Sequence, residues 1–96
     1  MPVALVLALI LSASTEFGQD YKTMERVAYC ESRFDVWAKN PHSDASGLFQ
    51  FMPRTFDHYA VKLYGFGPQF IWDPEVQART AAYMFSLGEK RQWQCK

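Results

Sequence analysis

The stretch Tyr29-Cys30-Glu31-Ser32-Arg33-Phe34-Asp35 places a cysteine beside a glutamate where an amphipathic helix is expected to end. The helix is predicted over residues 21–32, because Asp20 can act as its N-cap. Two questions follow from this stretch. The first is whether Glu31 is an ordinary surface carboxylate or an acid held against apolar surface, and the second is whether Cys30 is the covalent link that keeps it there.

Glu31 continues an apolar stripe of the predicted helix. Met24, Val27 and Ala28 lie at positions i, i+3 and i+4, and Glu31 occupies position i+7. A glutamate on such a stripe loses hydration, which disfavours its charged form and raises its pKa. A carboxyl group that stays protonated near neutral pH suits general acid catalysis. The alternative is that Glu31, so near the helix end, simply reaches solvent.

Composition restricts the classes of protein that this chain can represent. Its 96 residues suffice for one small domain, and its 10 basic and 10 acidic residues leave no net charge. We therefore expect no nucleic-acid partner, because the chain has no basic field. Aromatic residues make up 17% of the chain, enough to fill a thin core or to line a groove for flat-faced ligands such as sugars.

The N-terminus has a different composition. Residues 3–11 form a continuous apolar run, followed by Ser12, Ala13 and Ser14, as in the apolar region and cleavage site of a secretory signal peptide. We therefore predict a signal peptide or N-terminal anchor over residues 1–15, a domain over residues 16–96, and a secreted, periplasmic or cell-wall-associated protein. The alternative for the apolar run is a buried core helix.

The chain has two cysteines, Cys30 and Cys95. With an export signal, an even count favours one disulfide. The loop closed by such a bond spans 65 residues (95 − 30), for which the chain-entropy argument gives roughly 4 kcal/mol of stabilisation. The alternatives are two buried thiols or a metal pair. We predict no metal site and no cofactor, since neither cysteine has a further Cys or His at ligand spacing.

Two more helices are predicted downstream of a long irregular loop over residues 33–46. Thr55 is expected to cap the second helix, and Asp73-Pro74-Glu75 marks the start of the third, which Gly88 ends. The tail over residues 89–96 is expected to return Trp93 and Cys95 to the first helix. The fold class is therefore mainly α, with about three core helices and a loop that frames a cleft.

A second motif, Gly47-Leu48-Phe49-Gln50-Phe51-Met52-Pro53, lies between these helices. Gly47 lets the backbone approach another group closely, and Gln50 both donates and accepts hydrogen bonds. Such an amide suits sugar hydroxyl and acetamido groups. The alternative is a buried turn with a satisfied glutamine.

The two motifs together resemble the soluble lytic transglycosylase domain over about residues 21–93. The likeness rests on Glu31-Ser32, Phe34, Ala38, Asn40, Ser46 to Gln50, and Met52-Pro53. The resemblance implies a lysozyme-like fold that cleaves the glycan strands of peptidoglycan. The chain is also similar to the resuscitation-promoting factor domain, in residues 27–32, the Gly-Leu-x-Gln-Phe run, Gln77, Trp93-Gln94-Cys95 and that domain's disulfide.

The resemblance implies a role for each matching residue. Glu31 matches the sole catalytic acid/base, and Ser32 matches a serine that bonds near that acid and the substrate. Gln50 matches a glutamine that contacts the sugar beside the scissile bond, and Gly47 matches the close-approach glycine.

The chain departs from the family pattern at two positions, because Gln77 stands where transglycosylases usually have Asn and Met84 where many have Tyr. Tyr59 and Tyr83 are candidates to supply an aromatic hydroxyl instead, and either one is equally a core residue. Candidate sugar platforms, each with a core role as the alternative, are Trp37, Phe51, Trp72 and Trp93.

The expected reaction uses one carboxylate. A conventional glycosidase needs two, about 5 to 9.5 Å apart. The other acids of the chain are poorly placed for this, since they follow a helix end, lie in a loop or cap a helix; they are Asp35, Asp44, Asp73 and Glu75. The resemblance implies a lytic transglycosylase acting between N-acetylmuramic acid and N-acetylglucosamine. We also expect a monomer, with membrane contact only through an uncleaved N-terminal segment. The alternatives are a muramidase that uses Asp44 or another acid, a non-catalytic peptidoglycan-binding module, and a secreted toxin or inhibitor.

Overall fold

The computed structural model describes residues 1–65 and 67–95, and these residues form helices joined by loops. The elements in chain order are α1 (Val3–Glu16), α2 (Tyr21–Ser32), α3 (Pro53–Tyr64), η1 (Pro68–Phe70), α4 (Pro74–Ser86) and η2 (Lys90–Gln92). The described residues contain no strand, only isolated bridges from Ser46 to Lys39 and to Phe51. The mainly α fold class is confirmed.

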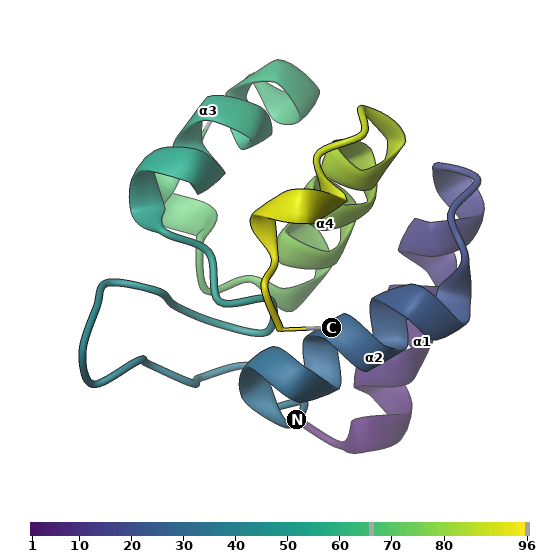
Figure 1. The fold of residues 1–96 in the computed structure, drawn as a ribbon, viewed down its shortest axis with the longest axis horizontal. Helices are drawn as coiled ribbons and strands as arrows, with labels where there is room; N and C mark the ends of the chain where they lie inside the picture. The colour runs from purple at the N-terminus through teal and green to yellow at the C-terminus, as the bar shows by residue number, and fades with distance from the viewer. Residues whose placement is uncertain (66, 96) are drawn as a thin grey trace.

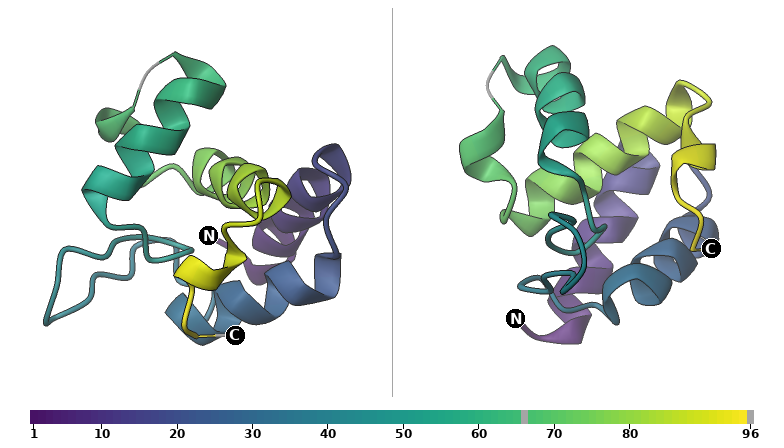
Figure 2. Two further views of the ribbon diagram at one scale, coloured as in Figure 1. Left: turned by 45° about the horizontal axis from the view of Figure 1, so that its top comes forward. Right: turned by 60° about the vertical axis from the view of Figure 1, so that its left-hand side comes forward.

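Helix α4 lies at the centre of the molecule. It packs against α1 on one side and α3 on the other, while α2 packs against α1 (Figure 1). Eight of its thirteen residues are buried, so nearly every side of the helix faces other parts of the chain. The C-terminal tail crosses α4 and ends beside α2, as predicted (Figures 1 and 2).

Local sequence signals explain where the helices begin. The Asp20 carboxylate accepts a hydrogen bond from Thr23 N at 3.0 Å, and Asp73 Oδ1 accepts one from Glu75 N at 2.9 Å. Helix α3 differs from the prediction, because it begins at Pro53 with Met52 as N-cap and leaves Thr55 inside the first turn. Proline needs no hydrogen-bond acceptor at the first helical position, so it starts the helix without a side-chain cap.

Helix α1 also differs from the prediction, which set residues 1–15 apart from the fold and left three core helices. Val6, Ile10 and Ala13 are at most 1% exposed and belong to the core. Their spacing of four and then three residues places them on one side of the helix. Arg79 of α4 also donates a hydrogen bond to Glu16 at the end of α1. In this structure the apolar run packs as a core helix, while a signal peptide or anchor over residues 1–15 stays a prediction. No helix in the described part of the chain is long and apolar enough to cross a membrane.

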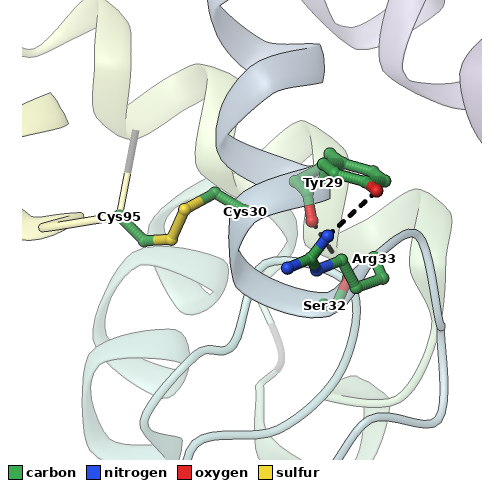
Figure 3. The surroundings of a disulfide bond; sticks show 6 residues. Tyr29, Cys30, Ser32, Arg33 and Cys95 are labelled. Carbon is green, nitrogen blue, oxygen red and sulfur yellow. Dashed lines mark hydrogen bonds between the residues drawn. A yellow bond between two sulfur atoms is a disulfide. The ribbon is translucent and has the colours of Figure 1, made fainter.

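The predicted disulfide joins Cys30 at the end of α2 to Cys95 in the tail (Figure 3). The two Cα atoms are 5.6 Å apart, which is a usual separation for a disulfide. On the other side of α2, Arg33 donates a hydrogen bond to the hydroxyl of Tyr29 at 2.9 Å (Figure 3). The disulfide therefore fixes the tail to the helix end that carries Glu31.

Candidate active site

A small cleft opens beside the end of α2. Its volume is about 140 Å³, which is below the usual size of a whole ligand pocket and suits only part of a larger ligand. It is lined by Glu31, Gln50, Phe51, Met52, Thr55, Met84, Gln92 and Trp93. These residues come from α2, the loop before α3, α3 itself, α4 and the tail, so the cleft exists only when all these parts are assembled.

Glu31 is half-buried at the rim of this cleft. Loss of hydration raises the pKa of its carboxyl group, and the backbone N–H of Cys95 acts in the opposite direction, because a hydrogen bond to the carboxylate stabilises the charged form. Burial is the larger of the two effects. The helical stripe therefore predicted the partly buried environment of Glu31, and the predicted disulfide placed Cys95 near it, but the hydrogen bond from the Cys95 backbone had no signal in the sequence.

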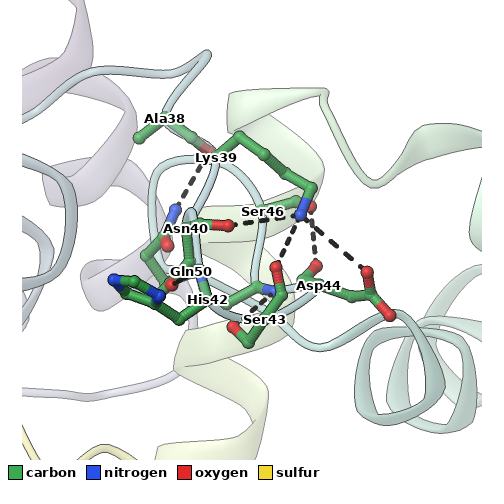
Figure 4. A network of polar contacts seen from close by, with 9 residues as sticks. Ala38, Lys39, Asn40, His42, Ser43, Asp44, Ser46 and Gln50 are labelled. Carbon is green, nitrogen blue, oxygen red and sulfur yellow. Dashed lines mark hydrogen bonds and ion pairs between the residues drawn. The ribbon is translucent and has the colours of Figure 1, made fainter.

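Gln50 shares the cleft with Glu31. Its φ angle of 53° lies in the left-handed region, which is uncommon for a residue other than glycine. Its side-chain nitrogen donates hydrogen bonds to Ala38 O at 3.0 Å and to Gly47 O at 2.9 Å (Figure 4 shows the contact with Ala38). Since both N–H groups have partners within the described chain, Gln50 offers its carbonyl oxygen, an acceptor, to a ligand.

Gln77 of α4 holds the loop that carries Gln50, a role that neither the resemblance nor the local sequence indicated. Gln77 is fully buried, accepts a hydrogen bond from Phe49 N at 2.8 Å and donates one to Ser46 O at 2.8 Å. It also donates to Ile71 O. Periodicity signalled only its burial, because Gln77 lies four and seven residues before the buried Ala81 and Met84.

The close contact between Gln77 and this loop requires a glycine at position 47. A Cβ atom at position 47 would lie 2.2 Å from the side-chain nitrogen of Gln77, and the φ angle of Gly47 is 83°. The close approach predicted for Gly47 is therefore an approach to Gln77, and Gly47 is not among the residues that line the cleft.

Two more side chains hold the same loop. The buried hydroxyl of Ser32 donates a hydrogen bond to Leu48 O at 2.7 Å, and the indole nitrogen of Trp93 donates one to Phe49 O at 2.9 Å. Ser32 thus lies behind the cleft wall and ties the end of α2 to the loop. The backbone of residues 46–49 is consequently held by α2, by α4 and by the tail.

The aromatic candidates separate into three groups. Phe51 and Trp93 line the cleft and are almost completely buried, with their ring centroids 5.5 Å apart. Tyr59 and Tyr83 do not line it; their rings are 6.5 Å apart, and the Tyr83 ring lies 5.9 Å from Phe17, on the side of the molecule where α1 ends. Trp37 and Trp72 form a separate pair. Met84, in the position where many family members have Tyr, lines the cleft.

Three of the other candidate acids have partners outside the cleft. Asp35 accepts a hydrogen bond from Trp37 N, Asp44 lies 3.9 Å from the Lys39 ammonium, and Asp73 caps α4. Figure 4 shows Asp44 and Lys39 in the polar network of the loop. Glu31 is the one carboxylate among the described residues that line the cleft. Residues 1–65 and 67–95 hold no group of three or more His, Cys, Asp or Glu residues suited to a metal ion.

The fold and the cleft define a class of protein: a small helical domain in which one half-buried glutamate at a helix end shares a cleft with a glutamine amide. The chain belongs to the transglycosylase SLT domain family, whose sequence model matches residues 8–92. This match confirms the resemblance inferred from the two motifs, and it begins within α1.

Two curated relatives come from staphylococci. The chain is 34% identical over 70 residues to probable transglycosylase SceD 2 of Staphylococcus saprophyticus, a match that covers 73% of the chain and 28% of that protein. It is 36% identical over 72 residues to probable transglycosylase SceD of Staphylococcus epidermidis, covering 73% of the chain and 32% of the relative. The chain thus spans less than a third of either relative. No solved structure matches it.

Proposed function

We propose that this domain is a peptidoglycan lytic transglycosylase that cleaves the β-1,4 bond between N-acetylmuramic acid and N-acetylglucosamine, with Glu31 as its sole acid/base. The observation that carries the proposal is that Glu31 is the one carboxylate among the described cleft residues. A hydrolytic glycosidase of the usual kind needs a second carboxylate to act as base or nucleophile. Membership of the SLT domain family supports the same reaction.

Glu31 performs both proton transfers in this reaction. In its protonated form, which burial favours, it donates a proton to the glycosidic oxygen while the bond from that oxygen to C1 of the muramoyl residue breaks. The resulting carboxylate then accepts the proton of the muramoyl 6-hydroxyl group as O6 bonds to C1. The products are a 1,6-anhydromuramoyl end and a free 4-hydroxyl group on N-acetylglucosamine, and no water is consumed.

The neighbouring side chains orient the sugar. Gln50 supplies an acceptor for a sugar hydroxyl or acetamido N–H, and Ser32 and Gly47 keep the Gln50 loop in place. Phe51 and Trp93 give the cleft an apolar wall that limits hydration of Glu31.

Product analysis tests the proposal. Purified peptidoglycan is digested in water labelled with oxygen-18, and the fragments are analysed by mass spectrometry. We expect 1,6-anhydro ends without the label. Labelled reducing ends in place of anhydro ends would identify a muramidase and overturn the transglycosylase assignment.

Matched variants test the role of Glu31. Glu31→Gln is expected to lower kcat/KM by about a hundredfold or more, the usual contribution of a general acid. Asp44→Asn changes an exposed loop carboxylate and is expected to retain activity, whereas a muramidase that used Asp44 would lose it. If native protein and Glu31→Gln bind peptidoglycan equally and neither cleaves it, the domain is a binding module.

A further inference from the structure

Two tryptophans form an exposed pair outside the Glu31 cleft. The side chain of Trp37 is 67% exposed, the largest value among the exposed large hydrophobic side chains of the described residues. Its ring centroid lies 6.0 Å from that of the partly exposed Trp72, and the two ring planes are inclined by 33°. Neither residue lines the cleft. An exposed tryptophan leaves a large apolar face in water, so this pair presents surface suited to a binding partner.

The backbone at both tryptophans is held in place. Trp37 N donates a hydrogen bond to Asp35 Oδ1 at 2.9 Å, and Ala38 N donates one to Asp35 O at 3.2 Å. Trp72 is preceded by Ile71, whose carbonyl accepts a hydrogen bond from Gln77, and is followed by Asp73, the N-cap of α4. Because both segments are ordered before binding, a ligand would meet a preformed surface and lose less entropy on association.

The surroundings of Trp37 are polar. Within residues 35–46, Trp37 is the only exposed large hydrophobic side chain. The loop is rich in hydrogen-bonding groups: Lys39 Nζ donates to Ser43 O at 2.6 Å, and Asn40 Oδ1 accepts from His42 N at 2.8 Å (Figure 4). A flat aromatic surface within a polar rim fits a ligand that has both an apolar face and hydroxyl groups. A sugar ring has this character.

We propose that Trp37 and Trp72 form a second glycan-binding site, at which a sugar ring of the glycan strand stacks on the indole rings. The choice of a glycan over another ligand rests on the proposed function. The pair is linked to the cleft through the backbone, because the carbonyl of Ala38, next to Trp37, accepts a hydrogen bond from Gln50, which lines the cleft. A strand that contacts both Gln50 and the tryptophan pair would compensate for the small volume of the cleft.

Binding measurements in the Glu31→Gln protein test this site without cleavage of the ligand. The probe is a soluble β-1,4-linked N-acetylglucosamine oligomer, titrated by calorimetry and by tryptophan fluorescence. Adding Trp37→Ala is expected to weaken binding by about three- to tenfold, the range for loss of one aromatic stacking contact. It should also reduce the blue shift of the emission on binding, because Trp37 is the highly exposed tryptophan of the pair and loses water contact when a sugar covers it. Trp37→Phe should recover part of the affinity.

The control is Val61→Ala, which shortens an exposed side chain on α3 and should leave affinity unchanged. Equal affinity of the Glu31→Gln protein with and without Trp37→Ala would overturn the site. So would a change in oligomeric state on Trp37→Ala, measured by sedimentation, with unchanged glycan affinity, because the pair would then contact a second copy. The product analysis of the native protein is a separate experiment. If the native protein is inactive but its binding of the N-acetylglucosamine oligomer still depends on Trp37, the proposed reaction is overturned and this binding site stands.

Discussion

Glu31 combines a position on an apolar helix stripe with a polar contact from a distant part of the chain. Burial beside the cleft raises the pKa of its carboxyl group, and the backbone N–H of Cys95 partly offsets this. The carboxylate is therefore less stable in the folded protein than in the unfolded chain, where glutamate has its ordinary pKa. An acid that must start the reaction protonated benefits from this arrangement at a cost in stability.

The cost predicts a pH dependence of unfolding. With a folded-state pKa above the ordinary value of 4.5, the contribution of Glu31 to stability is fully present at pH values below 4.5 and is lost as the pH rises through the folded-state pKa. Glu31→Gln removes this titration. The melting temperature of the variant should therefore rise relative to that of native protein as the pH increases from below 4.5 through the raised pKa.

Thermal unfolding followed by circular dichroism at several pH values measures this effect. Asp44→Asn, an exposed loop variant, serves as the control and should follow the native protein. A difference between Glu31→Gln and native protein that stays constant with pH would show that burial does not perturb the carboxyl group.

The close contact between Gly47 and Gln77 predicts that substitutions at these two positions have coupled effects on the free energy of unfolding. Gly47→Ala places a methyl group 2.2 Å from the Gln77 amide and imposes a left-handed φ on alanine, so it should lower the free energy of unfolding by about 2 kcal/mol or more. In a Gln77→Ala background only the backbone strain remains, and the cost should fall to about 1 kcal/mol. Urea denaturation of the four proteins in this double-mutant cycle measures the coupling. An equal cost of Gly47→Ala in both backgrounds would contradict the contact.

At the scale of elements, the cleft depends on one loop that α2, α4 and the C-terminal tail hold in place. Residues 46–49 receive hydrogen bonds from Ser32 of α2, Gln77 of α4 and Trp93 of the tail. Local signals predicted α2 and α4 well, because an aspartate cap and helical periodicity depend only on neighbouring residues. The start of α3 was missed, since a favourable first-turn proline outweighed a threonine cap.

The disulfide predicts how strongly the tail stabilises this arrangement. Replacing both cysteines by serine should lower the free energy of unfolding by roughly 4 kcal/mol, because the closed loop spans 65 residues. Activity should also fall at temperatures where the variant stays folded, since the tail supplies Gln92 and Trp93 to the cleft. Denaturation with and without reductant measures the first effect. Native protein that gives two free thiols on titration would contradict the bond.

At the scale of the whole molecule, α1 changes the account of stability. Its buried residues contact the same core as α2 and α4, and the SLT family match begins at residue 8. Composition alone suggested an export segment, because the run from Val3 to Leu11 is apolar on every side. Only the positions of α2 and α4 determine which side of that run is covered.

A pair of adjacent substitutions tests the role of α1. Ile10→Ala should lower the free energy of unfolding by about 2 to 4 kcal/mol, because it leaves a cavity in the core. Leu11→Ala, at a residue 52% exposed, should change it by less than about 0.5 kcal/mol. Urea denaturation of the chain beginning at Met1 gives both values. Equal small effects would mean that α1 does not contribute to the core.

The sequence by itself determined the mainly helical class, the helix that carries Glu31 in its last turn, the disulfide pairing and the two motifs that place the chain in its family. Each of these depends on local periodicity, on capping, on a cysteine count or on short motifs. Tertiary structure decided that α1 belongs to the core, that Gly47 accommodates Gln77, that Cys95 contacts Glu31, and that Trp37 pairs with Trp72. The last three contacts join residues between 30 and 64 positions apart, and the burial of α1 depends on which of its faces other helices cover. Contacts between such distant segments produce no periodicity or characteristic spacing in the sequence.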